Sequence, residues 1–358
     1  MSKHPPVLRD RIDPESAQGL QAYLDIVGPQ GINGIPDLGA RRARMRELTA
    51  AQRAQTPSNP RVEIQAQDIP GLAGDPDVPV RRYRRASAQR AGSPETGSDE
   101  AGAAGRPGVL FIHGGGMVLG DLDEDEASAI LIADELDAVV VSVGYRLAPE
   151  DPFPAGTRDC LAGLRWLAGH ADELGVDPDR LAVYGGSAGG GLAIATCLLN
   201  RDCTKSELTS ADPGYRADRP VNVAFLMAIY PMIDDRECTS SSQSVLDLGA
   251  WDRDGNREAW GWYVGRGAPT HLEAYAAPAR AVELADLPAT FIDVGDLDLF
   301  RDEDIDFAAR LMQAGVPCEL HVYPGSYHAS ELIAPDASLS QVIIATRLAA
   351  LRRALHDA

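Results

Sequence analysis

The clearest structural signal in the chain is residues 180–199, RLAVYGGSAGGGLAIATCLL. An apolar run typical of a buried strand leads into glycines around Ser187, and an apolar helical pattern follows. Gly185–Gly189 matches G-x-S-x-G, in which a sharp turn between strand and helix presents a serine hydroxyl above a sheet. A glycine-rich helix start without chemistry is the alternative. The strand and helix on either side favour a nucleophilic serine.

The same alternation of strand and helix patterns runs from Gly108 to the end of the chain. Short apolar runs, as expected for strands covered on both faces, alternate with amphipathic helical segments. This alternation predicts an α/β fold, in which helices flank both faces of a mostly parallel central sheet. The apolar runs are GVLFIH, AVVVSVG, RLAVYG, VAFLMAIYP, ATFIDVG and CELHVYP.

Four parts are expected along the chain. Residues 1–55 contain two helical patterns, and residues 56–233 form a first core segment that opens with two candidate strands, RVEIQAQ and VPVRRYRR. Within it, residues 86–107 are rich in Ala, Gly, Ser and Glu and are expected to form a flexible surface loop. Residues 234–269 break the alternation with a Trp-rich helical pattern and are interpreted as an insertion. Residues 270–358 complete the core.

Composition and charge exclude several classes of protein. The 358 residues are 44% apolar, which is enough for a sizeable core, and 53 acidic against 33 basic side chains give a net charge of -20. This charge argues against nucleic-acid or anionic-membrane partners. The chain has neither an apolar run long enough to span a membrane nor a signal-peptide pattern, so we expect a cytoplasmic protein. Five scattered cysteines without a C-x-x-C pair argue against a disulfide framework or a thiolate zinc site.

A second glycine-rich motif, His113–Gly116 (HGGG), directly follows the apolar run GVLFI. Tetrahedral intermediates of acyl transfer need backbone N–H donors near the developing oxyanion, and an HGGG string after an early strand is a known form of that device. The donor candidates are Gly115, Gly116 and, after the serine, Ala188. A dinucleotide-binding loop is the alternative, but G-x-G-x-x-G would require a glycine where Leu119 stands.

A serine nucleophile needs a base, and the base needs an orienting carboxylate. In the chain order typical of this motif, the acid and then the histidine follow the serine. The best candidate for the base is His328, because its loop, PGSYHAS, follows the last apolar run at the expected edge of the sheet. The other histidines lie at the insertion, inside a strand pattern and at the carboxy terminus: His271, His321 and His356.

Four aspartates compete for the role of the acid within IDVGDLDLFRDED. Asp293 sits inside a strand pattern, and Asp302 is expected to be the N-cap of the following helix. Spacing alone leaves Asp296 and Asp298 open.

Metal ions are not expected. Asp252, Asp254 and Asn256 imitate the start of a calcium-binding EF-hand loop, but its glycine and glutamate positions are Arg257 and Tyr263. The acidic runs DLDEDE (121–126) and RDEDID (301–306) are interpreted as solvated helix starts, where negative charge suits the helix dipole.

Taken together, the motifs make the chain resemble the hormone-sensitive-lipase family of α/β-hydrolases from about Gly108 to the end. The family's D-P-L-R-D-E pattern corresponds to DLFRDE here, which implies the acid at Asp298, the nucleophile at Ser187 and the base at His328. The resemblance also implies oxyanion donors at Gly115, Gly116 and Ala188, and a serine carboxylesterase that needs no cofactor. The motifs are HGGGM (113–117), YRLAPEDPFPA (145–155), GGSAGG (185–190), DLDLFRDE (296–303) and GVPCELHVYPGSYH (315–328).

The same resemblance implies a cap over the site, matched by the two amino-terminal helices and the insertion. It favours small-molecule esters with short-to-medium acyl chains and tolerance of bulky alcohols. The insertion's tryptophans have an alternative role, which we favour, in attaching the cap to the core. The candidates for substrate contact are Met117, Trp251, Trp260 and Trp262.

Two residues depart from the family pattern: Gly186 replaces the aspartate of G-D-S-A-G-G, and Leu299 replaces the proline after the acid. These departures bear on substrate range and pH optimum rather than on the set of three reacting side chains. The alternatives to an esterase are a lactone, amide or carbamate hydrolase with the same three residues, and a non-catalytic small-molecule receptor. A homodimer is compatible with all of these readings.

Overall fold

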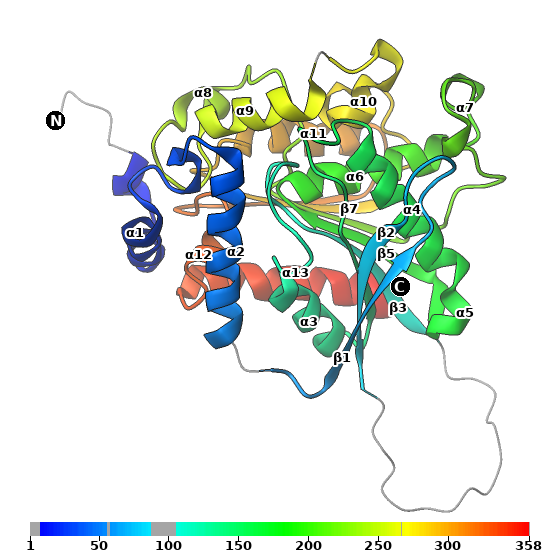
Figure 1. Ribbon diagram of the computed structural model, residues 1–358, viewed down its shortest axis with the longest axis horizontal. Helices are drawn as coiled ribbons and strands as arrows, with labels where there is room; N and C mark the ends of the chain where they lie inside the picture. The colour runs from blue at the N-terminus through cyan, green and yellow to red at the C-terminus, as the bar shows by residue number, and fades with distance from the viewer. Residues whose placement is uncertain (1–7, 56–57, 87–104, 266, 358) are drawn as a thin grey trace, which may run out of the picture.

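The computed structural model describes residues 8–55, 58–86, 105–265 and 267–357, which form an eight-stranded sheet with helices on both sides (Figure 1). The strand order is β1-β2-β4-β3-β5-β6-β7-β8. β1 pairs antiparallel with β2, and β2 with β4, whereas the other neighbouring pairs are parallel. The predicted α/β fold is therefore confirmed. The strands are β1 (Val62–Ile69), β2 (Val78–Arg85), β3 (Arg106–Ile112), β4 (Val139–Val143), β5 (Val176–Gly186), β6 (Phe225–Ile229), β7 (Ala289–Gly295) and β8 (Cys318–Tyr323).

One boundary differs from its prediction. β3 begins at Arg106, so the last two residues of the expected loop 86–107 belong to a strand. The reason is pairing, because Arg106 N–H donates to Gly175 O at 2.8 Å and Arg106 pairs with Val176 of β5. Residues 87–104 of that loop lie outside the described residues.

Helices fill the connections between the parallel strands, as the alternating pattern predicts, and other helices precede the first strand and follow the last. They are α1 (Pro14–Val27), α2 (Leu38–Gln55), α3 (Glu126–Glu135), α4 (Ala155–Gly169), α5 (Ala171–Leu174), α6 (Ala188–Asp202), α7 (Ser206–Ala211), α8 (Ser240–Ser244), α9 (Arg253–Val264), α10 (Glu273–Ala276), α11 (Arg301–Gln313), α12 (Ser330–Ile333) and α13 (Ser338–His356). Short 3-10 turns are η1 (Leu8–Arg11), η2 (Ile32–Gly34), η3 (Pro213–Tyr215), η4 (Thr270–Leu272) and η5 (Pro278–Arg280).

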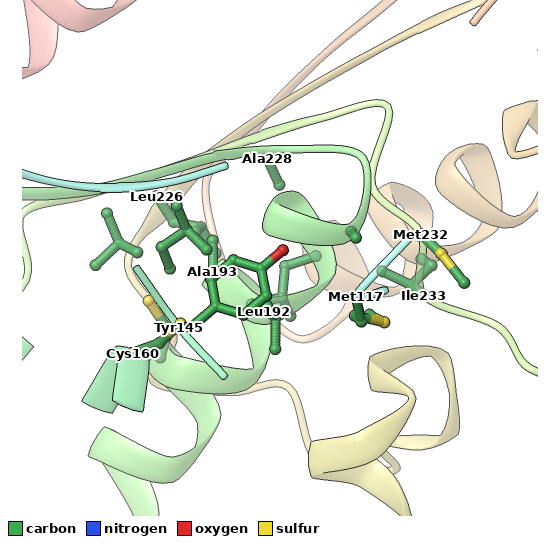
Figure 2. Packing of buried hydrophobic residues seen from close by; sticks show 14 of the residues in the cluster. Met117, Tyr145, Cys160, Leu192, Ala193, Leu226, Ala228, Met232 and Ile233 are labelled. Atoms are coloured by element: carbon green, nitrogen blue, oxygen red, sulfur yellow. The ribbon is translucent and has the colours of Figure 1, made fainter. Parts of the chain in front are cut away.

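The core consists of two apolar clusters, one on each face of the sheet. Successive residues of a strand point to opposite faces, so Leu110 of β3 joins the larger cluster and Phe111 joins the smaller. α4, α6 and α11 contribute to the larger cluster, and α3 and α13 to the smaller. Figure 2 shows part of the larger cluster, where Leu192 and Ala193 of α6 pack near Leu226 of β6.

The amino-terminal helices pack against the insertion and the core. Arg41 of α2 forms an ion pair with Glu258 of α9 at 2.8 Å, and its guanidinium lies 5.8 Å from the Trp262 ring centroid. The neighbouring Arg42 donates to Val118 O of the core at 2.8 Å. These contacts bring together the two segments, distant in the chain, that were expected to form the cap.

Gly189 in α6 is a position where the fold requires glycine. A Cβ atom there would lie 2.1 Å from Ile112 O, a backbone atom, so the strand and the helix would have to separate. We expect Gly189→Ala to lower the free energy of unfolding by at least about 3 kcal/mol, or to prevent folding. Gly261→Ala in α9 is the matched control, because nothing lies within 4 Å of its Cβ position and alanine favours helices by about 1 kcal/mol. Equal urea unfolding curves for the two variants would contradict this account of Gly189.

Candidate active site

Ser187 occupies the turn between β5 and α6. Its backbone has φ 57°, which is unfavourable for a residue with a side chain. The turn is held by the N–H of Ser187, which donates to Ile229 O of β6 at 2.9 Å. The flanking glycines are needed for space, since a Cβ atom on Gly185 would lie 2.1 Å from Gly189 O. This arrangement matches the predicted strand–serine–helix turn.

Three side chains from different loops form one hydrogen-bonded chain. Nε2 of His328 lies 2.9 Å from Oγ of Ser187, and Nδ1 of His328 lies 2.8 Å from Oδ2 of Asp298. All three side chains are buried. The second oxygen of Asp298 accepts a hydrogen bond from the N–H of Phe300 at 3.0 Å, which fixes the carboxylate. The structure thus brings together the serine, histidine and aspartate that the family resemblance selected.

The other three candidate acids have separate partners. Asp293 lies in β7 and binds Arg347. Asp296 accepts from the N–H of Gly325 at 2.7 Å and pairs with an arginine of the amino-terminal segment. The predicted N-cap role of Asp302 is wrong, because α11 begins at Arg301 and Asp302 lies in its first turn, where it accepts from the N–H of Ser241.

The remaining candidate histidines lie elsewhere. His321 is in β8 and its Nε2 is 2.8 Å from Glu319 Oε1, and His271 is in η4. His356 is the last residue of α13, where Nε2 donates to Leu136 O at 2.9 Å.

The glycine-rich loop lies directly beside Ser187. The Cβ position of Gly114 is 3.6 Å from Ser187 Cβ, so the loop and the serine turn are in contact. Gly115 and Gly116 have positive φ values of 98° and 63°, which glycine adopts without strain. Ala188 is the first residue of α6, and the first N–H groups of a helix have no acceptor within it. All three candidate oxyanion donors therefore lie on backbone that adjoins Ser187.

Tyr145 supports this loop, a role that was not predicted. Its single hydroxyl proton is shared between His113 O and Gly114 O, which lie 3.1 and 3.0 Å from the hydroxyl oxygen, and its ring stacks on His113 with centroids 4.2 Å apart. Burial lowers the pKa of His113 to about 4, so its ring stays neutral at neutral pH. The available sequence signal was the position of Tyr145 at the start of YRLAPEDPFPA.

A cavity of about 1150 Å³ reaches Ser187 and His328. Its wall includes Gly114–Gly116 beside the serine, Trp251 from the insertion, and apolar side chains of the amino-terminal helices, such as Tyr23 of α1 and Met45 of α2. Both parts of the expected cap thus contribute to the wall of the cavity.

Of the four expected substrate-contact residues, all of which the structure describes, Trp251 lines this cavity and the other three do not. Met117 has φ 63° and its side chain joins the larger core cluster near Met232 and Ile233 (Figure 2). Trp260 is buried beside Tyr263 on α9, and Trp262 faces α2, where Arg41 lies over its ring. Trp260 and Trp262 therefore pack among residues of the insertion and α2, and their role in attaching the cap to the core stays a prediction.

The acidic run 121–126 is not the solvated helix start that was expected. Its last four residues, Asp123–Glu126, line the cavity next to the glycine-rich loop. Arg53 and Arg81 each pair with both Asp123 and Glu126. Burial, together with the charges of neighbouring aspartates, raises the pKa of Glu124 to about 8, and burial raises the pKa of Asp125 to about 6. The cavity therefore has an acidic wall whose charge grows as pH rises through neutrality.

The described residues include neither a candidate membrane span nor a candidate metal site. None of their helices is long and apolar enough to cross a membrane. Likewise, no group of three or more His, Cys, Asp or Glu side chains among them could hold a metal ion.

The chain is similar to known proteins in sequence and in structure. The model of a family described as alpha/beta hydrolase fold matches residues 109–332. Carboxylesterase NlhH of Mycobacterium tuberculosis is 34% identical over 357 residues, covering 98% of this chain and 99% of the relative. Esterase LipI of the same species is 35% identical over 288 residues, 78% of this chain and 77% of the relative. A solved structure titled bacterial heroin esterase has a TM-score of 0.80 and 36% identity, covering 98% of this chain and 100% of that one.

The raised pKa of Glu124 predicts how stability depends on pH. Since that pKa lies above its ordinary value near 4.5, the folded state binds more protons between about pH 4.5 and 8, and the free energy of unfolding should fall as pH rises through that window. One such group contributes at most about 1.4 kcal/mol per pH unit. We expect Glu124→Gln to flatten this decline in urea unfolding measured from pH 5 to 8. Glu47→Gln, at an exposed glutamate, is the control, and equal slopes for both variants would contradict the prediction.

Proposed function

The chain belongs to the hormone-sensitive-lipase family of α/β-hydrolases and is a carboxylic ester hydrolase, and from this premise we propose that it is a serine carboxylesterase that acts through Ser187, His328 and Asp298. The observation that supports this proposal is the hydrogen-bonded chain of these side chains, at 2.8 and 2.9 Å, beside a loop of backbone donors. Nucleophile, base and orienting carboxylate are the three groups that acyl transfer to serine requires.

In the first half of the reaction, Oγ of Ser187 attacks the ester carbonyl carbon. Nε2 of His328 takes the hydroxyl proton, and the carboxylate of Asp298 stabilises the imidazolium that forms. The N–H groups of Gly115, Gly116 and Ala188 donate to the carbonyl oxygen as it becomes an oxyanion. The bond to the alcohol then breaks, His328 returns its proton to the alcohol oxygen, and an acyl-enzyme remains.

In the second half, water takes the place of the alcohol. His328 removes a proton from the water as its oxygen attacks the acyl carbon, and the same backbone donors hold the second oxyanion. The bond to Ser187 Oγ breaks, His328 returns the proton to that oxygen, and the carboxylic acid leaves. These reaction steps need no cofactor.

The substrates that fit best are neutral esters with short-to-medium acyl chains and bulky alcohols. The volume of the cavity, about 1150 Å³, accommodates a large alcohol group, and its apolar side chains favour uncharged surfaces. In its wall, the charge of Asp125 above about pH 6, and of Glu124 above about pH 8, disfavours anionic substrates by repulsion. A panel of esters, lactones, amides and carbamates distinguishes an esterase from the other hydrolases that use the same three residues.

Removal of the nucleophile should abolish ester hydrolysis. We expect Ser187→Ala to lower kcat for p-nitrophenyl butyrate by at least about 10⁴-fold, because no acyl-enzyme can form. Release of p-nitrophenolate is followed at 405 nm, roughly the wavelength of its absorption maximum, and thermal melting checks that the variant is folded. Hydrolysis at the wild-type rate by this variant would exclude the mechanism, and absence of turnover across the whole panel by the wild type would favour the receptor.

Asp296 and Asp298, between which spacing alone could not choose, provide a matched test of which carboxylate orients His328. Asp298→Asn should lower kcat by about 10³–10⁴-fold, because an amide no longer holds the imidazole in the required tautomer. Asp296→Asn should lower it by less than about tenfold, because its carboxylate binds the N–H of Gly325 and Arg11 and not His328. Similar losses in both variants, measured with the same ester, would count against Asp298 as the acid.

A further inference from the structure

A buried polar cluster lies behind His328 and has no part in the mechanism above. It contains Tyr230, Asp293, Glu331 and Arg347, each less than a tenth exposed. Arg347 binds Asp293 through two hydrogen bonds of 2.7 and 3.1 Å and donates to Oε1 of Glu331 at 2.6 Å. The hydroxyl of Tyr230 donates to the same Oε1 at 2.5 Å. We call these four residues the Arg347 cluster.

The members of the Arg347 cluster lie on, or directly after, four elements of the fold. Tyr230 directly follows β6, Asp293 lies in β7, Glu331 lies in α12, and Arg347 lies in α13. Glu331 comes three residues after His328, so its carboxylate connects the loop of the base to the sheet and to α13. A buried ion pair contributes little net stability, since desolvation offsets the attraction of its charges. The role of the Arg347 cluster is therefore better explained by the positions in which it holds its side chains than by a gain in stability.

Tyr230 is the member of the cluster that contacts the base. Its ring packs edge-on against the imidazole of His328, with centroids 4.8 Å apart and planes at 63°. The ring of Phe300 makes a similar contact, with centroids 5.2 Å apart. The imidazole is thus held by two rings as well as by its hydrogen bonds to Ser187 and Asp298.

The orientation of the Tyr230 ring is set from both of its ends. At the backbone, Tyr230 has φ 32° and its N–H donates to Asp293 O at 2.7 Å. At the far end, burial and the charge of Glu331 raise the pKa of Tyr230 well above its usual range, so the hydroxyl keeps its proton and donates to Glu331. Loss of this hydrogen bond frees one end of the ring.

We propose that Tyr230 is a positioning residue, held by Glu331 and Arg347 against His328, which keeps Nε2 within reach of Ser187 Oγ through both halves of the reaction. This inference rests on the proposed function, because it assumes that His328 is the base. A base must lie within hydrogen-bond reach of its proton, and a displacement of about 1 Å can cost about 100-fold in rate.

A substitution at Gly186 offers a second way to disturb the Arg347 cluster. A Cβ atom at this position would lie 3.6 Å from Tyr230 Cε2 and 3.8 Å from its hydroxyl oxygen, which are ordinary contacts. A side cavity of about 70 Å³ is lined by Gly186, Tyr230, Glu331 and Arg347, so a small side chain has room. Gly186→Asp would place a second carboxylate beside the Tyr230 hydroxyl, where it competes with Glu331.

The test compares variants of the cluster with a matched buried pair elsewhere. Tyr230→Phe and Glu331→Gln remove the hydroxyl and the charge that hold the ring. The control is Tyr275→Phe, because the Tyr275 hydroxyl donates to Asp202 at 2.9 Å and Arg201 binds that carboxylate, as in the Arg347 cluster. Asp202 ends the 15-residue α6, so this pair lies about 22 Å along the helix from Ser187.

Two rates are measured for each folded variant. One is kcat with p-nitrophenyl butyrate, and the other is the single-turnover rate with a p-nitrophenyl alkylphosphonate. The phosphonate forms a bond from phosphorus to Ser187 Oγ and releases p-nitrophenolate, while His328 takes the serine proton. We expect both rates to fall about tenfold or more in Tyr230→Phe and Glu331→Gln, with KM within about twofold. Tyr275→Phe should lose similar thermal stability but keep both rates.

A double-mutant cycle supplies a second measurement should Glu331→Gln fail to fold. Gly186→Asp should lower kcat when it is introduced into the wild type. In Tyr230→Phe, which lacks the hydroxyl for which the two carboxylates compete, the same substitution should lower kcat by less than about half that factor. Wild-type rates in a folded Tyr230→Phe, or an equal fall in Tyr275→Phe, would overturn the positioning role and leave the proposed function intact. Failure of the wild type itself to react with ester and phosphonate would instead overturn the proposed function.

Discussion

The backbone of Ser187 is the constraint on which the site depends. A residue with a side chain at φ 57° carries about 1–3 kcal/mol of strain, so the surrounding structure must hold it in place. Hydrogen bonds do this on both sides, because the N–H of Ser187 donates to Ile229 O and the N–H of Met232 donates to Ser187 O, each at 2.9 Å. The close approach of Gly185 and Gly189 then lets α6 begin directly beside the glycine-rich loop. The serine and the donor candidates are thus placed by one arrangement of backbone.

The base depends on parts of the chain that are far apart in sequence. The N–H of Asp13 donates to Gly325 O at 3.0 Å, and the hydroxyl of Tyr327 donates to Ser16 O at 3.2 Å. The amino-terminal helices therefore support the loop of His328 as well as lining the cavity. On its other side, Glu331 connects the same loop to α13. The position of the base therefore depends on contacts with the amino-terminal segment on one side and with α13 on the other.

Charge is distributed differently at the surface and in the cavity. The net charge of -20 argues against polyanionic partners, but says little about any single pocket. The structure adds that Asp123–Glu126 line the cavity, and that burial raises the pKa values of Glu124 and Asp125 to about 8 and 6. The acidic run 121–126 was interpreted as a solvated helix start, because a sequence pattern does not reveal which residues of a short loop will line a cavity.

Local patterns in the sequence were sufficient for the fold class, the serine turn and the glycine-rich loop, because strand, helix and turn patterns are set by residues that are neighbours in the chain. Spacing left Asp296 and Asp298 open, and the family resemblance favoured Asp298. Only the tertiary structure decided which carboxylate binds His328. In the turn after β7, Asp298 contacts His328, whereas Asp296 accepts a hydrogen bond from the N–H of Gly325. The tertiary structure also decided that Trp251 lines the cavity whereas Trp260 and Trp262 pack beside Tyr263 and Arg41, and it revealed the contacts of Tyr145 and Tyr230. Those outcomes depend on contacts between distant segments, which no local pattern encodes.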